Sequence, residues 1–421
     1  MRKLVIVLSA AALVVAFTLP AMAQSEWSFY GNARMWTEYK SFDKNNPSAS
    51  VLQFGLIGAN PFSGIDDESE LTWELQSNSR VGASVKAGDI GGRFEYGTGV
   101  NLRRLYGTWN FGAGQLLVGQ EYTPLFFPIS DQCGLGGGDC GLIFWGTVYT
   151  GRVPQLTLNW GGLKVGLLDP STAGIFEAGG TAAGVTPVSS ESECPTGTVE
   201  LADDGVTKLC VVLGAGPDFT AVDVDQTLPK IEASYTFNLG PAALFIGGGY
   251  NTADVEGVLA ADGTVRSESV DSWVVNAAAK MGFGAFYVNA SVAFAQNPAN
   301  YGLTQDIGIK GASYDFDNNR LEDCDSFFWA LILGFKVSDM WKIEGGIGWI
   351  SNSIDDPGEA GISYDEDSVA YYLQAAISPV KNFFIIPEVG YVDYKDLEVT
   401  GETDTDLGDA TYFAIKWQIN F

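Results

Sequence analysis

The feature that most constrains this chain is a repeated alternation of apolar and polar residues with a period of two. It is clearest in residues 411–421, TYFAIKWQINF, where one face carries Phe413, Ile415, Trp417, Ile419 and Phe421. The opposite face carries Ala414, Lys416, Gln418 and Asn420. A period of two is that of a β-strand, whose successive side chains point to opposite faces. The segment is therefore predicted to be a strand with one face suited to lipid and the other to water.

The same alternation recurs in residues 27–39, 231–239, 286–294 and 341–349. Charged residues such as Arg34, Glu232 and Lys342 stay off the apolar face of these segments. A Lys or Arg facing the middle of a bilayer costs about 2–4 kcal/mol, so this placement is expected of strands that contact lipid. A single strand would also suit a soluble sandwich, but the repetition favours a membrane barrel.

The predicted connections alternate between short and long. Short turns are expected at Gly88–Gly91, Gly112–Gly114, Gly161–Gly162, Gly240–Pro241, Gly282–Gly284, Ser338–Met340 and Pro379–Lys381. Long loops are expected at about 41–70, 121–150, 169–229, 255–270, 298–325, 354–367 and 397–408, with a brief one near Gly99–Asn101. We therefore predict an all-β fold, a transmembrane antiparallel β-barrel with short periplasmic turns and long extracellular loops.

Counting the segments between these connections predicts sixteen strands, with both ends of the chain on the short-turn side. Eighteen strands are an alternative, because residues 51–58 (VLQFGLIG) could form another strand or a hairpin within the first loop.

Residues 1–23 are interpreted as a signal peptide, so that the barrel comprises residues 24–421. Arg2 and Lys3 precede an apolar stretch that ends in the small-residue step Ala21-Met22-Ala23, a cleavage pattern. No later stretch stays apolar over the roughly 18 residues that a membrane helix requires. An exported chain with 25 Phe, 17 Tyr, 11 Trp and 52 Gly suits a barrel in the cell outer membrane of a Gram-negative bacterium.

The chain is strongly acidic, with 23 Lys and Arg against 51 Asp and Glu, a net charge of −28 that becomes −30 without Arg2 and Lys3. This charge opposes nucleic-acid binding, which requires a basic surface. The acid is concentrated in predicted loops, where it would attract cations, bridge to anionic lipid through Ca²⁺, or simply be solvated. Asp315, Asp317 and Asn319 resemble the start of a Ca²⁺ loop. Arg320 and Ser326 replace the Gly and Glu that such a loop needs, so no cofactor is predicted.

Five cysteines lie in an exported chain, where disulfides can form. The local pairings are Cys133 with Cys140 and Cys194 with Cys210, which would leave Cys324 over. Sequence alone does not determine the connectivity. Metal binding by thiolates is the weaker alternative, because no CxxC spacing occurs.

Several motifs resemble the general bacterial porin family, mainly between residues 79 and 160. They are Ser79-Arg80-Val81-Gly82, Leu102-Arg103-Arg104-Leu105-Tyr106-Gly107, Gly114 to Gln120, and Gly151-Arg152-Val153-Pro154. The terminal Phe421 matches the family's signal for insertion into the outer membrane. Beyond these pieces, the resemblance consists of the strand pattern alone.

The resemblance implies that the third loop, residues 121–150, folds into the lumen and narrows the channel. It implies a pore constriction made of Arg80, Arg103 or Arg104, and Arg152 on the wall, facing Asp131 and Asp139 from the loop. Opposed charges across a narrow aqueous gap create a transverse field that orients polar solutes. The alternative is that the arginines pair locally with neighbouring acids. Arg34 is also expected on the water side.

The third loop departs from the family, because the family's usual acidic stretch is replaced by the glycine-rich segment from Cys133 to Cys140. A disulfide there would stiffen the loop by lowering its free entropy. The long loop at 169–229 is a second departure, and could cap the mouth or contact a neighbouring subunit.

The expected function is passive diffusion of ions and small hydrophilic solutes, with a weak cation preference inferred from the acidic loops. The expected partners are outer-membrane lipid and lipopolysaccharide, and the resemblance implies a homotrimer. A structural or adhesive barrel is one alternative. Enzymatic activity is not expected, since the chain has no His to act as the usual base.

A substrate-specific channel, for example for sugars, is a further alternative. Aromatic side chains could line such a path if they faced the lumen; the candidates are Tyr30, Trp36, Tyr287, Phe328 and Tyr372. We instead expect these aromatics to belong to the girdles at the membrane interfaces.

Overall fold

The structure is a computed structural model that describes most of the chain. The described residues are 25–43, 69–134, 145–171, 185–189, 198–203, 207–212, 223–259, 265–303, 311–315, 320–355, 363–399, 405–406 and 408–421. The predicted signal peptide and residues 51–58 lie outside them. Among the described residues, no helix has the length and apolar character that crossing a membrane requires.

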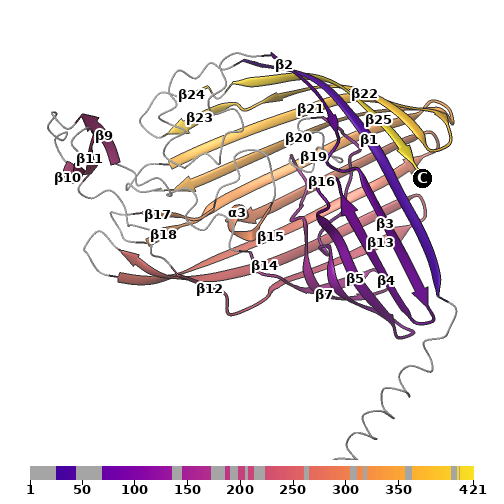
Figure 1. Cartoon of the computed structure of the whole chain (residues 1–421), viewed down its shortest axis with the longest axis horizontal. Helices are drawn as coiled ribbons and strands as arrows, with labels where there is room; N and C mark the ends of the chain where they lie inside the picture. The colour runs from indigo at the N-terminus through magenta and orange to yellow at the C-terminus, as the bar shows by residue number, and fades with distance from the viewer. Residues whose placement is uncertain are drawn as a thin grey trace, which may run out of the picture.

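Sixteen strands close into one antiparallel barrel, which confirms the predicted fold and strand count (Figure 1). In chain order they are β1 (Glu26–Asp43), β2 (Ser69–Leu75) together with β3 (Arg80–Ala87), β4 (Ile90–Gly97), β5 (Leu102–Asn110), β6 (Gln115–Tyr122), β7 (Arg152–Trp160), β8 (Leu163–Leu168), β13 (Lys230–Leu239), β14 (Ala242–Leu259), β15 (Val265–Phe283), β16 (Phe286–Gln296), β19 (Cys324–Lys336), β20 (Trp341–Asp355), β21 (Ser363–Val380), β22 (Phe383–Asp393) and β25 (Asp409–Asn420).

The barrel closes where the first strand meets the last. β1 pairs with β25 from Asn32 opposite Asn420 to Asp43 opposite Asp409. Beyond this ladder, the backbone N–H of Gly31 donates to the carbonyl of Phe421 at 2.8 Å, and the N–H of Phe421 donates back at 3.0 Å. A side chain at position 31 would collide with the ring of Phe421, so glycine at this position allows the terminal residue to pack against β1 where the barrel closes.

On its other side, β1 pairs with β2 along its second half and with β3 along its first half. β2 and β3 therefore form one interrupted strand of the barrel. At the interruption, the N–H of Arg34 donates to Ser79 Oγ at 3.0 Å, and the N–H of Gln76 donates to the carbonyl of Arg34 at 2.9 Å. A serine side chain replaces a missing ladder partner, which keeps the buried backbone hydrogen-bonded.

The two faces of the strands follow the predicted alternation. In β25, Phe413 and Ile419 are exposed on the outer face, whereas Tyr412, Ala414 and Lys416 are buried on the inner face. The other alternating segments behave in the same way. Exposed apolar residues therefore cover the outside of the barrel, as contact with lipid requires.

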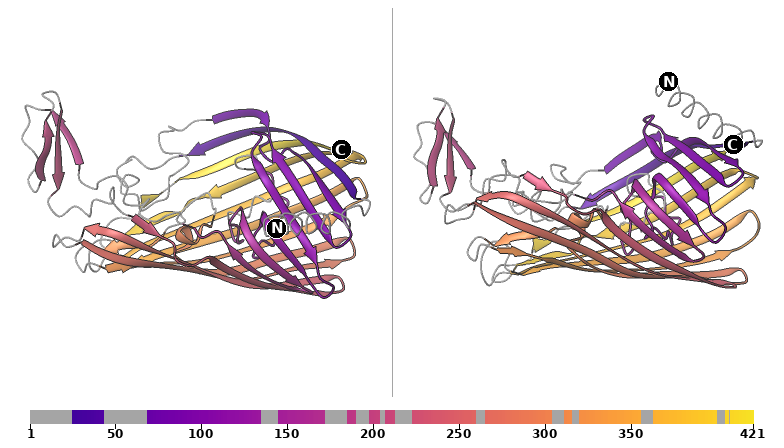
Figure 2. Two further views of the ribbon diagram at one scale, coloured as in Figure 1. Left: turned by 60° about the horizontal axis from the view of Figure 1, so that its bottom comes forward. Right: turned by 90° about the horizontal axis from the view of Figure 1, so that it is seen from below.

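The barrel wall is uneven in height, as Figures 1 and 2 show. β4 to β8 contain between 6 and 9 residues each, and they form the short wall. β14, β15 and β21 contain 18 or 19 residues each, and they belong to the tall wall that runs from β13 to β22. The strands of the tall wall extend into segments that were expected to be loops: β14 reaches Leu259 and β15 begins at Val265.

The long loops contain small elements of their own. A separate three-stranded sheet lies within the predicted loop 169–229 and consists of β9 (Val185–Ser189), β10 (Thr198–Asp203) and β11 (Thr207–Val212). The other elements are β12 (Asp223–Asp225), the short helix α3 (Pro298–Tyr301), the hairpin of β17 (Ser313–Asp315) and β18 (Arg320–Glu322), and the strands β23 (Asp396–Val399) and β24 (Thr405–Asp406).

Candidate functional site

The described parts of the third loop, residues 123–134 and 145–150, pack against the inner face of the tall wall. Leu125, Ile129, Trp145 and Val148 are buried in one cluster with wall residues. The tall wall presents small side chains to this cluster, namely Ala293, Ala330 and Ala370, and the adjacent β25 presents Ala410 and Ala414. Small residues leave room for the loop's larger side chains.

Three glutamates of the tall wall accept hydrogen bonds from backbone N–H groups of this loop. Glu232 of β13 accepts from Leu125 at 3.1 Å, and Glu344 of β20 accepts from Asp131 at 2.9 Å. Glu388 of β22 accepts from Cys133 at 2.7 Å and from Gly134 at 2.6 Å. Hydrogen bonds to a charged acceptor are shorter and stronger than neutral ones. The three carboxylates therefore act as anchors along the first arm of the loop.

Tyrosines connect these anchors to one another. Tyr372 donates to Glu344 at 2.7 Å and lies 2.8 Å from the hydroxyl of Ser130. Tyr412 donates to Glu388 at 2.9 Å and accepts from Gln132 at 2.8 Å. Each phenol thus joins a wall carboxylate to a loop side chain.

The second arm of the loop returns past Trp145 and Gly146. Trp145 Nε1 donates to Ser368 Oγ at 2.8 Å, and Ser291 donates to the carbonyl of Gly146. Gly146 has a φ of +89°, and a Cβ there would collide with the backbone of Trp329. Only glycine fits this close approach between the loop and β19.

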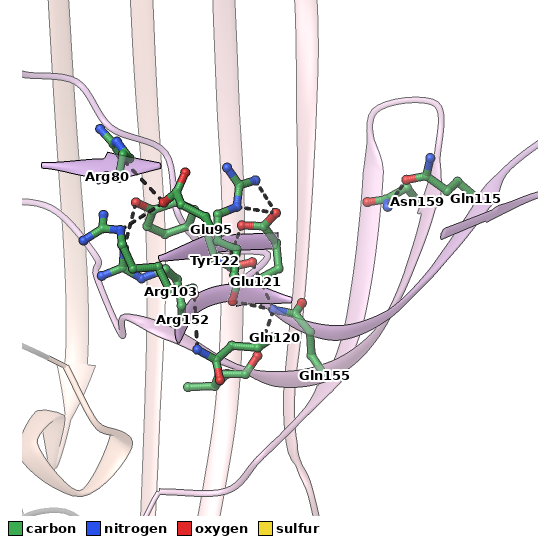
Figure 3. A network of polar contacts seen from close by, with 12 residues as sticks. Arg80, Glu95, Arg103, Gln115, Gln120, Glu121, Tyr122, Arg152, Gln155 and Asn159 are labelled. Atoms are coloured by element: carbon green, nitrogen blue, oxygen red, sulfur yellow. Dashed lines mark hydrogen bonds and ion pairs between the residues drawn. The ribbon is translucent and has the colours of Figure 1, made fainter. Parts of the chain in front are cut away.

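The short wall carries a cluster of arginines. Glu95 of β4 accepts from Arg103 Nε at 2.9 Å, pairs with Arg80 at 3.7 Å, and accepts from Tyr30 at 2.9 Å (Figure 3). Glu95 is buried, whereas the side chain of Arg80 is 20% exposed. The positive end of Arg80 therefore reaches water, whereas Arg103 and the shared carboxylate are buried.

Arg104 and Arg152 lie at the base of the third loop. Arg104 Nε donates to Glu121 Oε2 at 3.0 Å, and Arg104 lies 5.5 Å from the centre of the Tyr122 ring. Arg152 lies 5.1 Å from the same ring and donates to the hydroxyls of Tyr122 and Tyr149, both at 3.4 Å.

The sequence left open whether Arg103 or Arg104 faces the lumen, and the structure turns both inward. The register between β4 and β5 shifts at this point, because Glu95 pairs with Arg104 and Tyr96 pairs with Leu102. Arg103 is the extra residue of this β-bulge, a device that redirects a side chain.

The predicted loop carboxylates are placed as follows. Asp131 forms an ion pair with Lys342 of β20. Asp139 lies outside the described residues. The carboxylates that contact Arg80, Arg103 and Arg104 are Glu95 and Glu121 of the wall itself.

Sequence reasoning missed Glu95 and Glu121, and it missed the three anchors. A signal was present in part, since Glu232 and Glu344 are isolated acids on the polar face of otherwise apolar alternating segments.

The expectation that certain aromatics belong to interface girdles is wrong. Trp36 and Phe328 are fully buried inside the barrel, and Tyr287 and Tyr372 donate to Glu344. Tyr30 donates to Glu95. Where the third loop lies against the wall, the inner face is packed rather than open to water. Aromatic side chains on that face therefore contact the loop or hydrogen-bond to the buried carboxylates.

A second segment that the sequence did not reveal also enters the barrel. In α3, Tyr301 is buried and donates to Glu232 at 2.9 Å, while Lys230 Nζ donates to the carbonyl of Tyr301 at 3.2 Å. Burial and the adjacent Glu232 carboxylate raise the pKa of Tyr301 well above its ordinary value. Glu232 is thus shared between the third loop and the loop that connects β16 to β19.

The predicted metal and disulfide residues are only partly described. Asp317, Asn319, Cys140 and Cys194 lie outside the described residues, and only the backbone of Asp315 and Cys210 is described. The described part of the chain contains no cluster of three or more His, Cys, Asp or Glu that could hold a metal ion. The two disulfide pairings stay predictions.

A cavity of about 640 Å³ opens inside the barrel at the short-turn end. Its polar lining includes Arg34, Asp131, Lys342, Gln374 and Lys416. A hollow with a charged lining leads from this end toward the inserted loop, as an aqueous path would require.

A closed sixteen-stranded barrel, apolar outside and polar inside, with a loop folded into its interior, defines a membrane channel. The chain belongs to the Gram-negative porin family, whose model matches residues 9–397. It is an outer-membrane porin that allows passive diffusion of small hydrophilic solutes.

Several solved structures share the fold of this chain. The outer membrane channel DcaP of Acinetobacter baumannii is 14% identical, with a TM-score of 0.60 over 95% of this chain and 98% of that one. The trimer form of OmpT of Vibrio cholerae is 16% identical, with a TM-score of 0.52 over 94% and 99%. An anion-selective porin from Comamonas acidovorans is 11% identical, with a TM-score of 0.51 over 94% and 100%. No curated protein sequence matches this chain.

Proposed function

We propose that this porin favours small anionic solutes, because the charge that its inner wall exposes to water is positive. The observation that carries the proposal is that most carboxylates of the inner wall are buried, whereas several arginines and lysines of the short wall stay partly exposed. It concerns the described residues and is independent of the net charge of the whole chain.

Seven carboxylates of the inner wall are buried, with exposed fractions of at most 9% for the whole residue; they are Glu38, Glu95, Glu121, Glu232, Glu344, Glu366 and Glu388. Glu232, Glu344 and Glu388 among them are the loop anchors. Glu95 and Glu121 pair with the arginines described above. Glu26 and Glu74, on the inner face of β1 and β2, are exposed. Asp131 is an exposed loop carboxylate, and it is paired with Lys342. Where a carboxylate is paired with cations, as Glu95 is with Arg80 and Arg103, its field in the water-filled path is offset.

Several cations of the inner wall stay in contact with water. The exposed fractions of the side chains of Arg80 and Arg104 are 20% and 18%. Two exposed lysines also lie on the inner face: Lys86 on the same face of β3 as Arg80, and Lys164 on the same face of β8 as the buried Leu168. Low-dielectric walls focus the field of such charges into the lumen and raise the local concentration of anions.

The sequence-based prediction of a weak cation preference came from the acidic loops, which lie at the mouth of the channel. Much of the acid, such as Asp66-Asp67-Glu68 and Glu402 to Asp404, lies outside the described residues. Charges at an open mouth are screened within about 8 Å at physiological salt, whereas charges along a narrow path are screened less. The inner wall therefore outweighs the loops in our proposal. A porin of the same fold, that of Comamonas acidovorans, is anion-selective, so the fold is compatible with this preference.

The reversal potential in planar bilayers under a KCl gradient tests the proposal. We expect a potential of the sign that marks Cl⁻ as more permeant than K⁺. Arg80→Gln should move the potential toward that of K⁺, whereas Lys381→Gln, in an exposed periplasmic turn, should leave it unchanged. A potential that marks K⁺ as the more permeant ion would overturn the proposal and restore the sequence-based prediction.

We further propose that the porin is a homotrimer without catalytic activity. The trimer form of the Vibrio cholerae OmpT barrel supports the first part. The lack of His in the chain supports the second, because the usual base of hydrolytic triads is missing. Chemical cross-linking in lipid vesicles should yield a species of three chains; a species of one chain alone would contradict the trimer.

A further inference from the structure

Three aromatic rings gather where the two arms of the third loop leave the barrel wall. Tyr122 ends β6, Phe126 begins the inward arm, and Tyr149 ends the returning arm. The rings of Tyr122 and Phe126 stack with centroids 4.3 Å apart and an interplanar angle of 13°. Tyr149 lies 5.6 Å from Phe126 at an angle of 60°. All three side chains are partly exposed. We name these three rings the aromatic strip.

Arg152 lies against the aromatic strip with donors to spare. Its guanidinium carries five N–H groups, and the structure uses two of them in hydrogen bonds of 3.4 Å to phenol hydroxyls. Both bonds are long, so a stronger acceptor could replace them. Among the described residues, no carboxylate forms an ion pair with Arg152, in contrast to Arg80, Arg103 and Arg104.

Arg93, another arginine of the short wall, lies in a different setting. Arg93 likewise stacks on a ring, that of Tyr30 at 5.2 Å, but Tyr30 is part of the Glu95 cluster, whose carboxylate accepts its hydroxyl. The strip at Arg152 has stacked rings and a guanidinium without a neighbouring carboxylate.

From this juxtaposition we infer that Tyr122, Phe126, Tyr149 and Arg152 form a binding site for small aromatic carboxylates on the permeation path. The inference rests on the proposed function, since it names the class of anion that this part of the lumen would retain.

The chemistry of an aromatic carboxylate fits both halves of the site. Its two oxygens match the guanidinium fork, which binds carboxylates in a bidentate manner. Its ring can pack edge-to-face or offset against the strip, as aromatic pairs prefer. The site is shallow and partly exposed, so it would hold a solute briefly and release it, as passage through a channel requires.

Block of the ion current through single channels in planar bilayers tests the inference. Three probes separate charge from ring: benzoate has both, cyclohexanecarboxylate has the same charge without a π-system, and benzyl alcohol has the ring without the charge. We expect benzoate to block at a concentration about fivefold lower than cyclohexanecarboxylate, and benzyl alcohol to be the weakest of the three.

Two variants with matched controls locate the block. Arg152→Gln should raise the blocking concentration of both carboxylates by about tenfold, as loss of a charged partner implies. Phe126→Leu should remove the difference between benzoate and cyclohexanecarboxylate while retaining their block. The controls are Lys381→Gln, in an exposed turn, and Phe237→Leu, on the lipid face. The probes should block both control channels at the same concentrations as they block the unaltered channel.

The outcomes distinguish this inference from the proposed function. Equal block by benzoate and cyclohexanecarboxylate, in a channel whose reversal potential favours Cl⁻, would overturn the aromatic site and leave the anion preference intact. A reversal potential that favours K⁺ would overturn the anion preference itself. Block by benzoate that Arg152→Gln leaves unchanged, in a channel that still forms a folded barrel by electrophoresis without heating, would place the site elsewhere.

Discussion

The backbone N–H of Cys133, in the third loop, donates a hydrogen bond of 2.7 Å to Glu388 of β22. The next residue, Gly134, donates to the second oxygen of the same carboxylate at 2.6 Å. One buried charge on the wall therefore holds two consecutive amides of the loop. The position of the loop, and with it the width of the path beside the short wall, depends on a few charged acceptors.

The first prediction concerns this anchor. In Glu388→Gln, one of the two amides loses its acceptor and the other keeps a neutral one. Since hydrogen bonds to charged groups contribute about 1.5–3 kcal/mol and neutral ones about 0.5–1.5, docking of the loop should weaken by roughly 2 kcal/mol. We expect noisier single-channel currents with more frequent brief closures. The exposed Asp339→Asn, in the turn before β20, is the control. Noise equal to that of the control would show that Glu388 does not hold the loop.

A second prediction concerns Glu95, which neutralises Arg80 and Arg103 from within the wall. Glu95→Gln removes this negative charge and leaves both guanidinium groups in place. The reversal potential under a KCl gradient should therefore move further toward the Cl⁻ potential. Arg103→Gln should move it in the opposite direction. Movement of both variants in the same direction would contradict an electrostatic role for the cluster.

A third prediction uses the buried phenol of α3. Tyr301→Phe removes the hydrogen bond to Glu232, and at pH 8 this loss should destabilise the folded barrel by about 1.5–3 kcal/mol. The folded state raises the pKa of Tyr301, so it binds the phenol proton more tightly than the unfolded state does. The contribution is therefore complete below the unfolded value of about 10 and is lost as the pH rises above it.

Urea unfolding in lipid vesicles at pH 8 and at pH 11 measures this effect. The difference in stability between the unaltered protein and Tyr301→Phe should shrink at the higher pH. A difference that stays constant would mean that Tyr301 is not coupled to Glu232.

A fourth prediction separates steric from conformational strain in the third loop. Gly146 and Gly151 both have positive φ values, +89° and +77°, but only at Gly146 would a Cβ meet another part of the backbone. Gly146→Ala should push the returning arm away from β19 and change the single-channel conductance. Gly151→Ala incurs only the backbone cost, about 1 kcal/mol, and should keep the conductance. If both variants conduct alike, the close approach to Trp329 does not position the loop.

The sequence predicted the barrel well because contact with lipid imposes a rule on every second residue. Phe413 and Trp417 could be assigned to the outer face from their spacing alone, and the structure confirms it. The number of strands followed from the turns. The inner face obeys no such rule, since Phe328 packs against the loop while Lys342 meets Asp131, and both positions are equally inward.

The partners of the arginines were harder to predict for a further physical reason. A bulge of one residue at Arg103 reverses the face of a side chain, and neither composition nor spacing reveals it. The anchors Glu232 and Glu388 contact loop residues that are more than 100 positions away, so only the closed barrel brings them together.

The difference in height between the two walls has a consequence for how solutes approach. A tilted strand crosses the membrane with about 9–11 residues, so β15, with 19 residues, has roughly eight to ten to spare. At about 3.3 Å per residue and a tilt near 40°, that surplus stands roughly 20 Å above the lipid, while β4 to β8 end near its surface. The rim of the mouth therefore slopes from the tall wall down to the short wall. Molecules that approach along the membrane surface, through the surface polysaccharide, are shielded on the side of the tall wall and have direct access over the arginine-bearing short wall.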